Sequence, residues 1–563
     1  MIVTTSAHAL LQVFADNGLD RVFLVPGESY LGVLDALSDF PHIDVVTCRH
    51  EAGASFMACA DGRLTKRPGV VMVSRGPGAT NASIGVHNAQ QDAIPLILVI
   101  GQIPKADLRK EAFQEIDYQR MYGSIAKWVV EVTDPSKLAE AAFKAIRIAT
   151  SGTPGPVVLV VPEDIQQQTV PQPHWTVSPQ AATVPSPGAL EQVVDLLRAA
   201  ERPLIIAGGA LDSDRGRNAL RRLAEAAHVP VAVSFRQHDI FPNTHPLFVG
   251  DLGLVNPREQ IAAFDRSDLI LAIGTRLGDI TTQGYAFPSL PKPRQPLVHV
   301  YPDDHIVGLH VSADVGVVCD PALFAEALAD RVERALVDTP VETRAGRQAW
   351  ADTLHAMHAD IARWPSIAVE DGVPFASVVE RLAAIAPPNL AVCLDAGTFA
   401  APVYRHFSFV YPQRLMAPLS GAMGYGTPAA VATKLRHPER PVVCMVGDGG
   451  FLMTGNEMIA AVERALPIVF ILSNNNCYGS IRVHQDKTYP GRHVGTTLSN
   501  PNFVAIARAF GIQAERVDAA DQIDGALDRA FHAQAPYFIE VRTSLDAILP
   551  RASQPAVQAR SGN

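Results

Sequence analysis

The segment 442–481 constrains the fold of this chain more than any other stretch. It begins with an apolar run at 442–446 that is typical of a buried parallel strand and stops at a glycine-rich turn. A helical apolar pattern follows, Pro467 ends it, and 468–472 predicts a second strand that runs into a row of asparagines. The segment therefore predicts a βαβ unit. Its two loops should meet at the carboxyl edge of one parallel sheet, where such sheets bind ligands.

Two oxygen-bearing side chains occupy these loops. Asp448 is a hard carboxylate ligand flanked by Gly447 and Gly449, and glycines let backbone amides approach a phosphate. Asn475 offers a neutral amide oxygen from the neighbouring loop. One carboxylate, one amide oxygen, a backbone carbonyl and phosphate oxygens together suit six-coordinate Mg²⁺. Each loop alone is typical of an ordinary turn, but the two in one βαβ unit favour a Mg²⁺ ion that holds a diphosphate.

This pattern resembles a known signature. GDG at 447–449, followed after 24 residues (450–473) by the asparagine pair at 474–475, is similar to the signature of thiamine diphosphate-dependent enzymes. The text around it, over almost the whole chain, resembles the acetolactate synthase large-subunit branch. The resemblance implies thiamine diphosphate and Mg²⁺ as cofactors. It implies metal binding by the side chains of Asp448 and Asn475 and the carbonyl of Cys477. The implied cofactor-binding set is Gly447, Asp448, Gly449, Gly450, Asn475, Tyr478, Gly479 and Ser480.

Length and pattern predict three domains. A chain of 563 residues is too long for one core, and strands alternate with helices throughout, which predicts doubly wound α/β domains with parallel sheets. The resemblance implies a pyrimidine domain and a diphosphate domain that flank a central Rossmann-like domain. The predicted division is 1–168 pyrimidine-binding domain, 169–188 linker, 189–340 central nucleotide-binding-like domain, 341–368 connector, 369–550 diphosphate- and Mg-binding domain, and 551–563 C-terminal tail.

Composition excludes several function classes. The net charge is −10 and no lysine or arginine block occurs, which argues against nucleic acid or an anionic membrane as a partner. The six cysteines form no CxxC pair, which favours reduced thiols in a cytoplasmic protein and argues against a zinc site. The N-terminal stretch does not have the pattern of a signal peptide, and no apolar run reaches membrane-spanning length.

Glu51 is the predicted catalytic acid. It lies where a strand gives way to a helix of small apolar residues, a dry place for an acid, although helix-start glutamates commonly serve only the helix dipole. The text at 49–54, RHEAGA, resembles the family's catalytic glutamate motif, which implies that Glu51 activates the cofactor through its pyrimidine ring. Because Glu51 and Asp448 lie in different domains, the family's arrangement implies a site at the subunit interface of a homodimer or homotetramer.

Two further loops are implied to hold the cofactor. On the family pattern, Met423 bends the cofactor, and the carbonyl of Gly421 accepts a hydrogen bond from the cofactor's amino group. The alternative for Met423 is that a single bulky apolar residue among glycines simply fills space in the core. Gly397 and Thr398, after a predicted strand, resemble the family's second diphosphate loop. A simple strand-to-helix turn is the alternative for this pair.

The prediction of substrate-binding residues rests on a shorter motif. Phe113 and Gln114 match an acetolactate synthase motif as pocket residues. Glu28 lies in the loop that faces substrate in this superfamily and is either a proton relay or a solvated helix-start glutamate. Arg75 fits a loop that shapes the cofactor cavity, but a surface arginine in a glycine-rich turn is the plainer interpretation.

The sequence departs from acetolactate synthases at the acceptor side. Ile280 stands where those enzymes have a second arginine for a 2-keto acid acceptor, and a carboxylate in an apolar pocket without a partner is costly. His484 replaces a tryptophan that screens acceptor size. FAD, which acetolactate synthases carry in the central domain, is compatible with 208–210, 251–253 and Arg276, but none of these residues is specific for it.

The resemblance implies a thiamine diphosphate- and Mg²⁺-dependent carboligase or decarboxylase that takes a pyruvate-like 2-keto acid through an enamine. One alternative is a carboligase, decarboxylase or C–C lyase whose acceptor is an aldehyde, a diketone or an acyl-CoA. Another is a pyruvate oxidase-like flavoenzyme. A third is a relative that binds the cofactor but has lost catalytic activity, and the presence of Glu51 argues against it. The donor, the acceptor and any regulatory subunit stay open.

Overall fold

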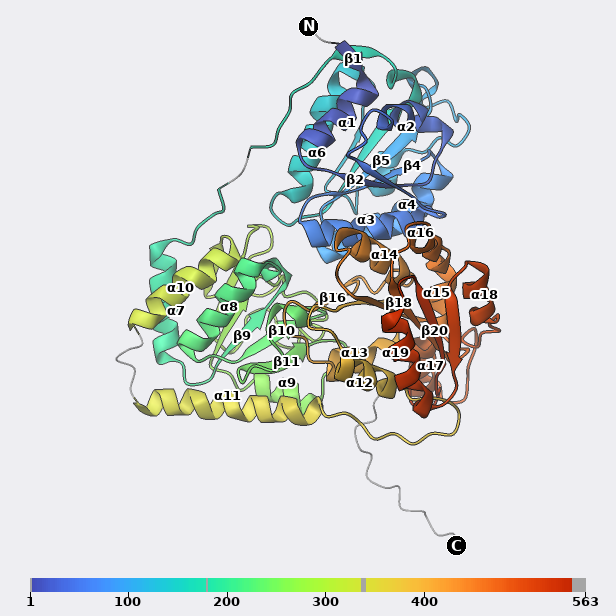
Figure 1. The fold of residues 1–563 in the computed structure, drawn as a ribbon. Helices are drawn as coiled ribbons and strands as arrows, with labels where there is room; N and C mark the ends of the chain where they lie inside the picture. Colours follow the sequence, from blue (N-terminus) through green and yellow to red (C-terminus); the bar gives the residue numbers. More distant parts are fainter. Residues whose placement is uncertain (1–2, 179–180, 336–340, 549–563) are drawn as a thin grey trace.

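The computed structural model describes residues 3–178, 181–335 and 341–548, and it forms three α/β domains (Figure 1). Each domain is built on its own parallel sheet of six strands. This confirms the predicted class of three doubly wound domains. No described helix is both long and apolar enough to cross a membrane.

In the first domain, helices cover both faces of a central sheet. Its strands are β2 (Arg21–Leu24), β3 (Asp44–Thr47), β4 (Gly69–Val73), β5 (Leu96–Gln102), β6 (Trp128–Glu131) and β7 (Pro156–Pro162), in the order β3-β2-β4-β5-β7-β6. Its helices are α1 (Ser6–Asp16), α2 (Leu31–Leu37), α3 (Glu51–Thr65), α4 (Pro77–Asp92), α5 (Tyr118–Tyr122) and α6 (Leu138–Thr150). The inner strands are continuous apolar runs because both faces are buried. A short strand β1 (Val3–Thr5) pairs antiparallel with β8 (Thr169–Pro171), so the start of the predicted linker is held against the N-terminal strand.

The central domain repeats the architecture with its own cores. Its strands are β9 (Pro203–Ala207), β10 (Val231–Ser234), β11 (Phe248–Leu252), β12 (Leu269–Ile273), β13 (Leu297–Tyr301) and β14 (Val315–Val318), in the order β11-β10-β9-β12-β13-β14. Its helices are α7 (Pro187–Ala199), α8 (Asp214–Ala227), α9 (Arg258–Phe264) and α10 (Pro321–Ala335). Most of the predicted connector is the long helix α11 (Val341–Ile361), which runs along this domain (Figure 1). Trp350 anchors α11 by donating its indole N–H to the carbonyl of Pro203 at 2.9 Å.

The third domain contains the predicted βαβ unit. Its strands are β15 (Ala391–Leu394), β16 (Arg414–Met416), β17 (Val442–Gly447), β18 (Ile468–Asn474), β19 (Gln513–Val517) and β20 (Tyr537–Arg542), in the order β16-β15-β17-β18-β20-β19. Its helices are α12 (Phe375–Ile385), α13 (Ala401–His406), α14 (Gly426–Arg436), α15 (Asp448–Thr454), α16 (Met458–Glu463), α17 (Gly479–Thr488), α18 (Phe503–Ala509) and α19 (Ile523–His532). A 3₁₀ turn, η8 (Gly455–Glu457), separates α15 from α16.

The first and third domains share one hydrophobic core. Helix α3 packs on α14, and Figure 1 shows this contact as the main seam between the two domains. Phe56 and Tyr425 are buried there and meet edge to face with ring centroids 5.7 Å apart. Such a continuous apolar contact fixes the two domains relative to each other within one chain.

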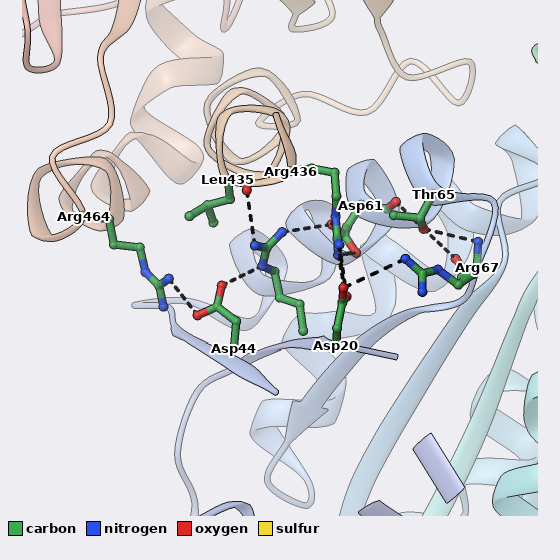
Figure 2. Close-up of polar contacts among 9 residues, drawn as sticks. Asp20, Asp44, Asp61, Thr65, Arg67, Leu435, Arg436 and Arg464 are labelled. Atoms are coloured by element: carbon green, nitrogen blue, oxygen red, sulfur yellow. Dashed lines mark hydrogen bonds and ion pairs between the residues drawn. The ribbon is translucent and has the colours of Figure 1, made fainter. Parts of the chain in front are cut away.

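A chain of alternating arginines and aspartates runs beside this apolar contact (Figure 2). We call it the seam network, and it comprises Asp20, Arg21, Asp44 and Asp61 of the first domain and Arg436 and Arg464 of the third. Its centre is the pair of the buried Asp61 and the half-buried Arg436, whose two hydrogen bonds measure 2.8 and 2.9 Å. Arg436 also reaches Asp20 at 3.0 Å, and Arg464 reaches Asp44 at 2.8 Å. The network therefore joins the end of α14 and the loop after α16 to the first domain.

Candidate active site

The two predicted metal-binding side chains lie at the same edge of the third sheet. Strands β17 and β18 are parallel neighbours in register from Val442↔Ile468 to Gly447↔Ser473. Asp448 is the first residue of α15, directly after β17, and Asn475 directly follows β18. The expectation that both loops emerge at one carboxyl edge is confirmed.

Three residues, which we call the clasp, converge there: Asp448, Asn475 and Cys477. The backbone N–H of Cys477 donates to Asp448 Oδ2 at 3.3 Å and to Asn475 Oδ1 at 3.1 Å, so both oxygens face one point. The carbonyl oxygen of Cys477 accepts from Gly479 N–H at 2.8 Å and keeps a second lone pair. Asn500, which the sequence did not single out, donates its amide to Asp448 Oδ2 at 2.8 Å.

The electrostatics of the clasp suit a hard cation. Asp448 is only 3% exposed, and burial raises the pKa of its carboxyl group above the usual range. A nearby cation would offset this cost of burying the charge. Carboxylate, amide and carbonyl oxygens are ligands that Mg²⁺ accepts, and softer metals prefer nitrogen or sulfur. The donor set therefore fits the implied ion.

The predicted second diphosphate loop joins the clasp from β15. The backbone N–H of Thr398 donates to Ser480 Oγ at 3.0 Å. A Cβ atom at Gly479 would lie 3.1 Å from Thr398 Oγ1 and 3.4 Å from the side-chain nitrogen of Asn475. The absence of a side chain at Gly479 thus lets the loops after β15 and β18 close on each other.

Protein atoms fill the space beside the glycines of the GDG turn. A Cβ atom at Gly449 would lie 2.3 Å from the ring of Tyr478, and one at Gly450 would lie 2.6 Å from Asp395 Oδ2. These glycines allow α15 to begin tight against its neighbours. Their backbone amides remain part of the first turn of α15, where an anion is favoured.

Asp395 holds the loop 419–424, which we call the Met423 loop. Both carboxylate oxygens of Asp395 accept the N–H of Gly424 at 2.9 Å, and burial raises the pKa of Asp395 to about 7. Thr454 of α15 donates its hydroxyl to the carbonyl of Gly424 at 2.6 Å. Gly421 has φ +70°, which favours glycine, and among the described residues other than its chain neighbours none has an atom within 4 Å of its Cβ position. Met423 itself is half-buried beside these contacts.

Glu51 begins α3 and points to the start of α4. Its Oε2 accepts from the side chain of Asn81 at 3.0 Å, and a Cβ atom at Gly78 would lie 3.2 Å from its Oε1. No hydrogen bond or ion pair among the described residues joins Glu51 to Asp448 or Asn475 of the same chain. The single chain therefore presents the acid and the clasp separately.

The predicted pocket residues lie next to the same helix start. Gln114 adopts φ +64°, and a Cβ atom at Gly76, just before α4, would lie 2.7 Å from its carbonyl oxygen. Phe113 is 75% exposed. The loop that carries both residues therefore borders the N-terminal part of α4, whose Asn81 binds Glu51.

Glu28 and Arg75 form an ion pair at 3.0 Å. Arg75 also binds Glu163 at 3.0 Å and is buried, so the interpretation of Arg75 as a surface arginine is wrong. Two carboxylates compensate its buried charge, which explains why an arginine is stable there. The Glu28 carboxylate is exposed apart from this pair.

The central-domain residues that are compatible with FAD have partners within the protein. A Cβ atom at Gly208 would lie 2.4 Å from the carbonyl of Gly274, and one at Gly209 would lie 3.0 Å from the side chain of Gln237. Arg276 donates to the carbonyl of Gln91 at the end of α4. Packing within the chain explains these residues without a nucleotide. Ile280 is half-buried, and His484 is exposed on α17.

Sequence reasoning missed four acids and amides that organise these loops: Asp92, Asp395, Glu457 and Asn500. Asp395 directly follows a strand, as Asp448 does, and a glycine lies two residues after it, so this pattern could have identified it. The others bind atoms far away in the sequence, for example Asp92 to Ser420 N–H at 2.9 Å. Local sequence patterns contain no signal for such pairs.

Comparison with known proteins agrees with this geometry. Three family profiles match in order: "Thiamine pyrophosphate enzyme, N-terminal TPP binding domain" at 4–121, the central domain at 190–328, and the C-terminal TPP binding domain at 395–541. The acetolactate synthase large subunit of Parasynechococcus marenigrum is 30% identical, over 95% of this chain and 87% of that protein. The large subunit of acetolactate synthase isozyme 3 of Escherichia coli is 29% identical, over 94% and 92%.

A solved structure has the same fold. The thiamine diphosphate-dependent 4-hydroxybenzoylformate decarboxylase of Rhodococcus jostii RHA1 superposes with a TM-score of 0.83 over 97% of this chain and 100% of that chain, at 24% identity. At this identity the likeness concerns the three-domain fold alone.

Proposed function

Because the chain belongs to the thiamine pyrophosphate enzymes and is related to acetolactate synthase large subunits, we propose that it is a thiamine diphosphate- and Mg²⁺-dependent carboligase or decarboxylase of a pyruvate-like 2-keto acid. Its family makes it a transferase or lyase. The clasp is the observation that carries the proposal, since oxygens from two neighbouring loops face the single amide of Cys477.

Each part of the site has a role in this proposal. Asp448, Asn475 and Cys477 would hold Mg²⁺, and the loops at Thr398 and Ser480 would hold the diphosphate. When bound, thiamine diphosphate supplies a nucleophilic carbon and an electron sink for decarboxylation.

Glu51 would hold the proton that starts the reaction. Asn81 donates to its Oε2, which leaves Oε1 to exchange a proton with the pyrimidine ring. The exposed Phe113 and the neighbouring Gln114 would contact the substrate from the loop beside this helix start.

A second copy of the chain would complete the site, in a homodimer or homotetramer. Glu51 has no hydrogen bond to the clasp of its own chain within the described residues. Leu452 and Met453 on α15, beside the clasp, are 52% and 46% exposed, and a partner subunit would cover such apolar side chains. Six buried, unpaired cysteines support a reducing compartment such as the cytoplasm.

The acceptor side favours a second candidate within the same chemistry. The stretch 274–282 contains Arg276 as its only arginine or lysine, and Arg276 binds the carbonyl of Gln91. The half-buried Ile280 cannot pair with a second carboxylate. This favours an aldehyde, a diketone or an acyl-CoA as acceptor, or decarboxylation without an acceptor, over a second keto acid. FAD is not part of the proposal, because packing explains the residues compatible with it, and we expect a colourless protein.

Product identification tests the reaction. The protein is incubated with thiamine diphosphate, Mg²⁺ and pyruvate, alone and with an aldehyde, a diketone, a keto acid or an acyl-CoA, and CO₂ release and products are measured. Failure of the wild type to bind thiamine diphosphate in the presence of Mg²⁺ would refute the proposal.

Two substitutions separate the two halves of the site. Glu51→Gln should leave cofactor binding intact and lower turnover at least about a hundredfold, the scale of a lost acid–base group. Asp448→Asn should instead weaken binding of Mg²⁺ and thiamine diphosphate. Glu259→Gln, an exposed first-turn glutamate on α9, is the matched control and should change neither. Comparable turnover in Glu51→Gln would contradict the role of Glu51.

A further inference from the structure

A carboxylate of the third domain binds the turn that carries Glu51. Glu457, in η8 between α15 and α16, is fully buried. Its Oε1 accepts the backbone N–H groups of Arg49 at 3.0 Å and His50 at 2.9 Å. Gly53 has no side chain where Glu457 packs, since a Cβ atom there would lie 2.5 Å from Glu457 Cγ. The turn before α3 is therefore shaped around this acid.

The first domain binds the Met423 loop in the same manner. Asp92 ends α4, and its two carboxylate oxygens accept the backbone N–H groups of Leu419 at 3.0 Å and Ser420 at 2.9 Å. Asn88, one turn earlier on α4, contacts the hydroxyl of Ser420 at 2.7 Å. These amides begin the loop that contains Met423.

The two contacts are equivalent in chemistry and opposite in direction. In each, one carboxyl group accepts two successive backbone N–H groups of the other domain at 2.9–3.0 Å. In each, the bound amides lie within four residues of a side chain that the family pattern implies at the cofactor, Glu51 in one case and Met423 in the other. Nothing in the proposed chemistry uses Glu457 or Asp92 directly.

We propose that Glu457 and Asp92 are reciprocal positioning residues, through which each cofactor-facing domain fixes the active-site turn of the other. Glu457 sets the place of Glu51, and Asp92 sets the place of Met423. This rests on the proposed function, in which Glu51 serves the clasp of a second copy of the chain, and on the expected contact of Met423 with the cofactor held by the clasp of its own chain. The two contacts then set the register between those sites.

Steady-state kinetics that measure kcat and KM separately test the proposal. At saturating thiamine diphosphate and Mg²⁺, Glu457→Gln should lower kcat for pyruvate about tenfold with KM and cofactor affinity unchanged, because a misplaced acid slows only the chemical step. Asp92→Asn should instead raise the concentration of thiamine diphosphate needed for half-saturation about tenfold. Glu463→Gln, in an exposed ion pair with Arg49 in the same seam, is the matched control and should change each value less than twofold. Equal effects of Glu457→Gln and Glu463→Gln on kcat would overturn the proposal.

Backbone amide hydrogen exchange gives a second test that needs no activity. Exchange at Arg49 and His50 should rise about tenfold or more in Glu457→Ala, the scale of one lost hydrogen bond, and less in Glu457→Gln, which keeps an acceptor oxygen. Exchange at Leu419 and Ser420 should rise in Asp92→Asn. Unchanged exchange in folded Glu457→Ala and Asp92→Asn would also overturn the proposal. If the wild type binds no thiamine diphosphate, the proposed function fails, and exchange still decides whether the two carboxylates fix the turns.

Discussion

Replacement of Asp61 by Asn should destabilise the protein more than any other single isosteric change in the seam network. The Asp61 side chain is 6% exposed, and it faces Arg436, which is 15% exposed, through two hydrogen bonds of 2.8 and 2.9 Å. Asn keeps the shape but removes the charge. The half-buried guanidinium of Arg436 then loses one of its two carboxylate partners (Figure 2).

The magnitude follows from burial and from the remaining partners. Breaking a buried ion pair by removal of one partner costs about 3–5 kcal/mol. Arg436 keeps its contact with Asp20, and Asn can still accept one hydrogen bond, so we expect a loss of about 2–3 kcal/mol in the free energy of unfolding. Asp20→Asn is the matched control. Its side chain is 48% exposed, and exposed pairs contribute about 0.2–1 kcal/mol.

Urea unfolding followed by circular dichroism measures both variants against the wild type. A double-mutant cycle with Arg436→Met should give a coupling free energy of about 1–3 kcal/mol between Asp61 and Arg436. If Asp61→Asn costs no more than Asp20→Asn, or if the coupling is near zero, the seam network does not hold the two domains together as argued.

Two further predictions concern burial and space. Burial raises the pKa of Asp395 to about 7, so the stability that Asp395 contributes is present at low pH and is lost as the pH rises from about 4 to 7. The difference in Tm between Asp395→Asn and the wild type should therefore shift in favour of the variant across this range, by the equivalent of about 3–4 kcal/mol, and a constant difference would contradict the assignment. Gly69→Ala would place a Cβ atom 1.9 Å from the carbonyl oxygen of Ala58 and should prevent soluble expression. Gly346 is exposed on α11, and within the described part of the chain no atom outside its own helix backbone lies within 4 Å of its Cβ position, so Gly346→Ala should stabilise the protein by about 0.5–1 kcal/mol in thermal unfolding.

The strands and the sheet edge followed from the sequence because their signals are local. The apolar runs at 442–446 and 468–472 predicted two strands, and the parallel pairing of β17 with β18 places their loops together. The helix between them was less predictable. Its apolar pattern indicated a helix near 458–466, but the structure begins helix at Asp448 and interrupts it at η8. Glycine disfavours helix by local propensity, and here the packing of Tyr478 and Asp395 against the glycines overrides that cost.

Only the candidate site residues that belong to recognisable sequence motifs could be predicted. The clasp lies within one βαβ unit and the Glu51 turn within a few residues, so the residue types of each could be interpreted together. The acids that fix these turns could not, because Glu457 and Asp92 act on backbone amides of another domain and any residue type can supply an amide. Arg75 was misinterpreted for a related reason, since its partners Glu28 and Glu163 come from two separate elements.

The pairing of β1 with β8 reduces the structural role of the segment between β8 and α7. The first described strand and the exit from the first domain are tied together at Val3↔Pro171, and the first domain is seated on the third through α3 and α14. Most described residues between β8 and α7 are exposed, and the first of them stay on the first domain, where Asn17 binds the backbone of Trp175 and Val177. A chain nicked by a protease in that stretch would remain a single particle, with its severed pieces held by the seam.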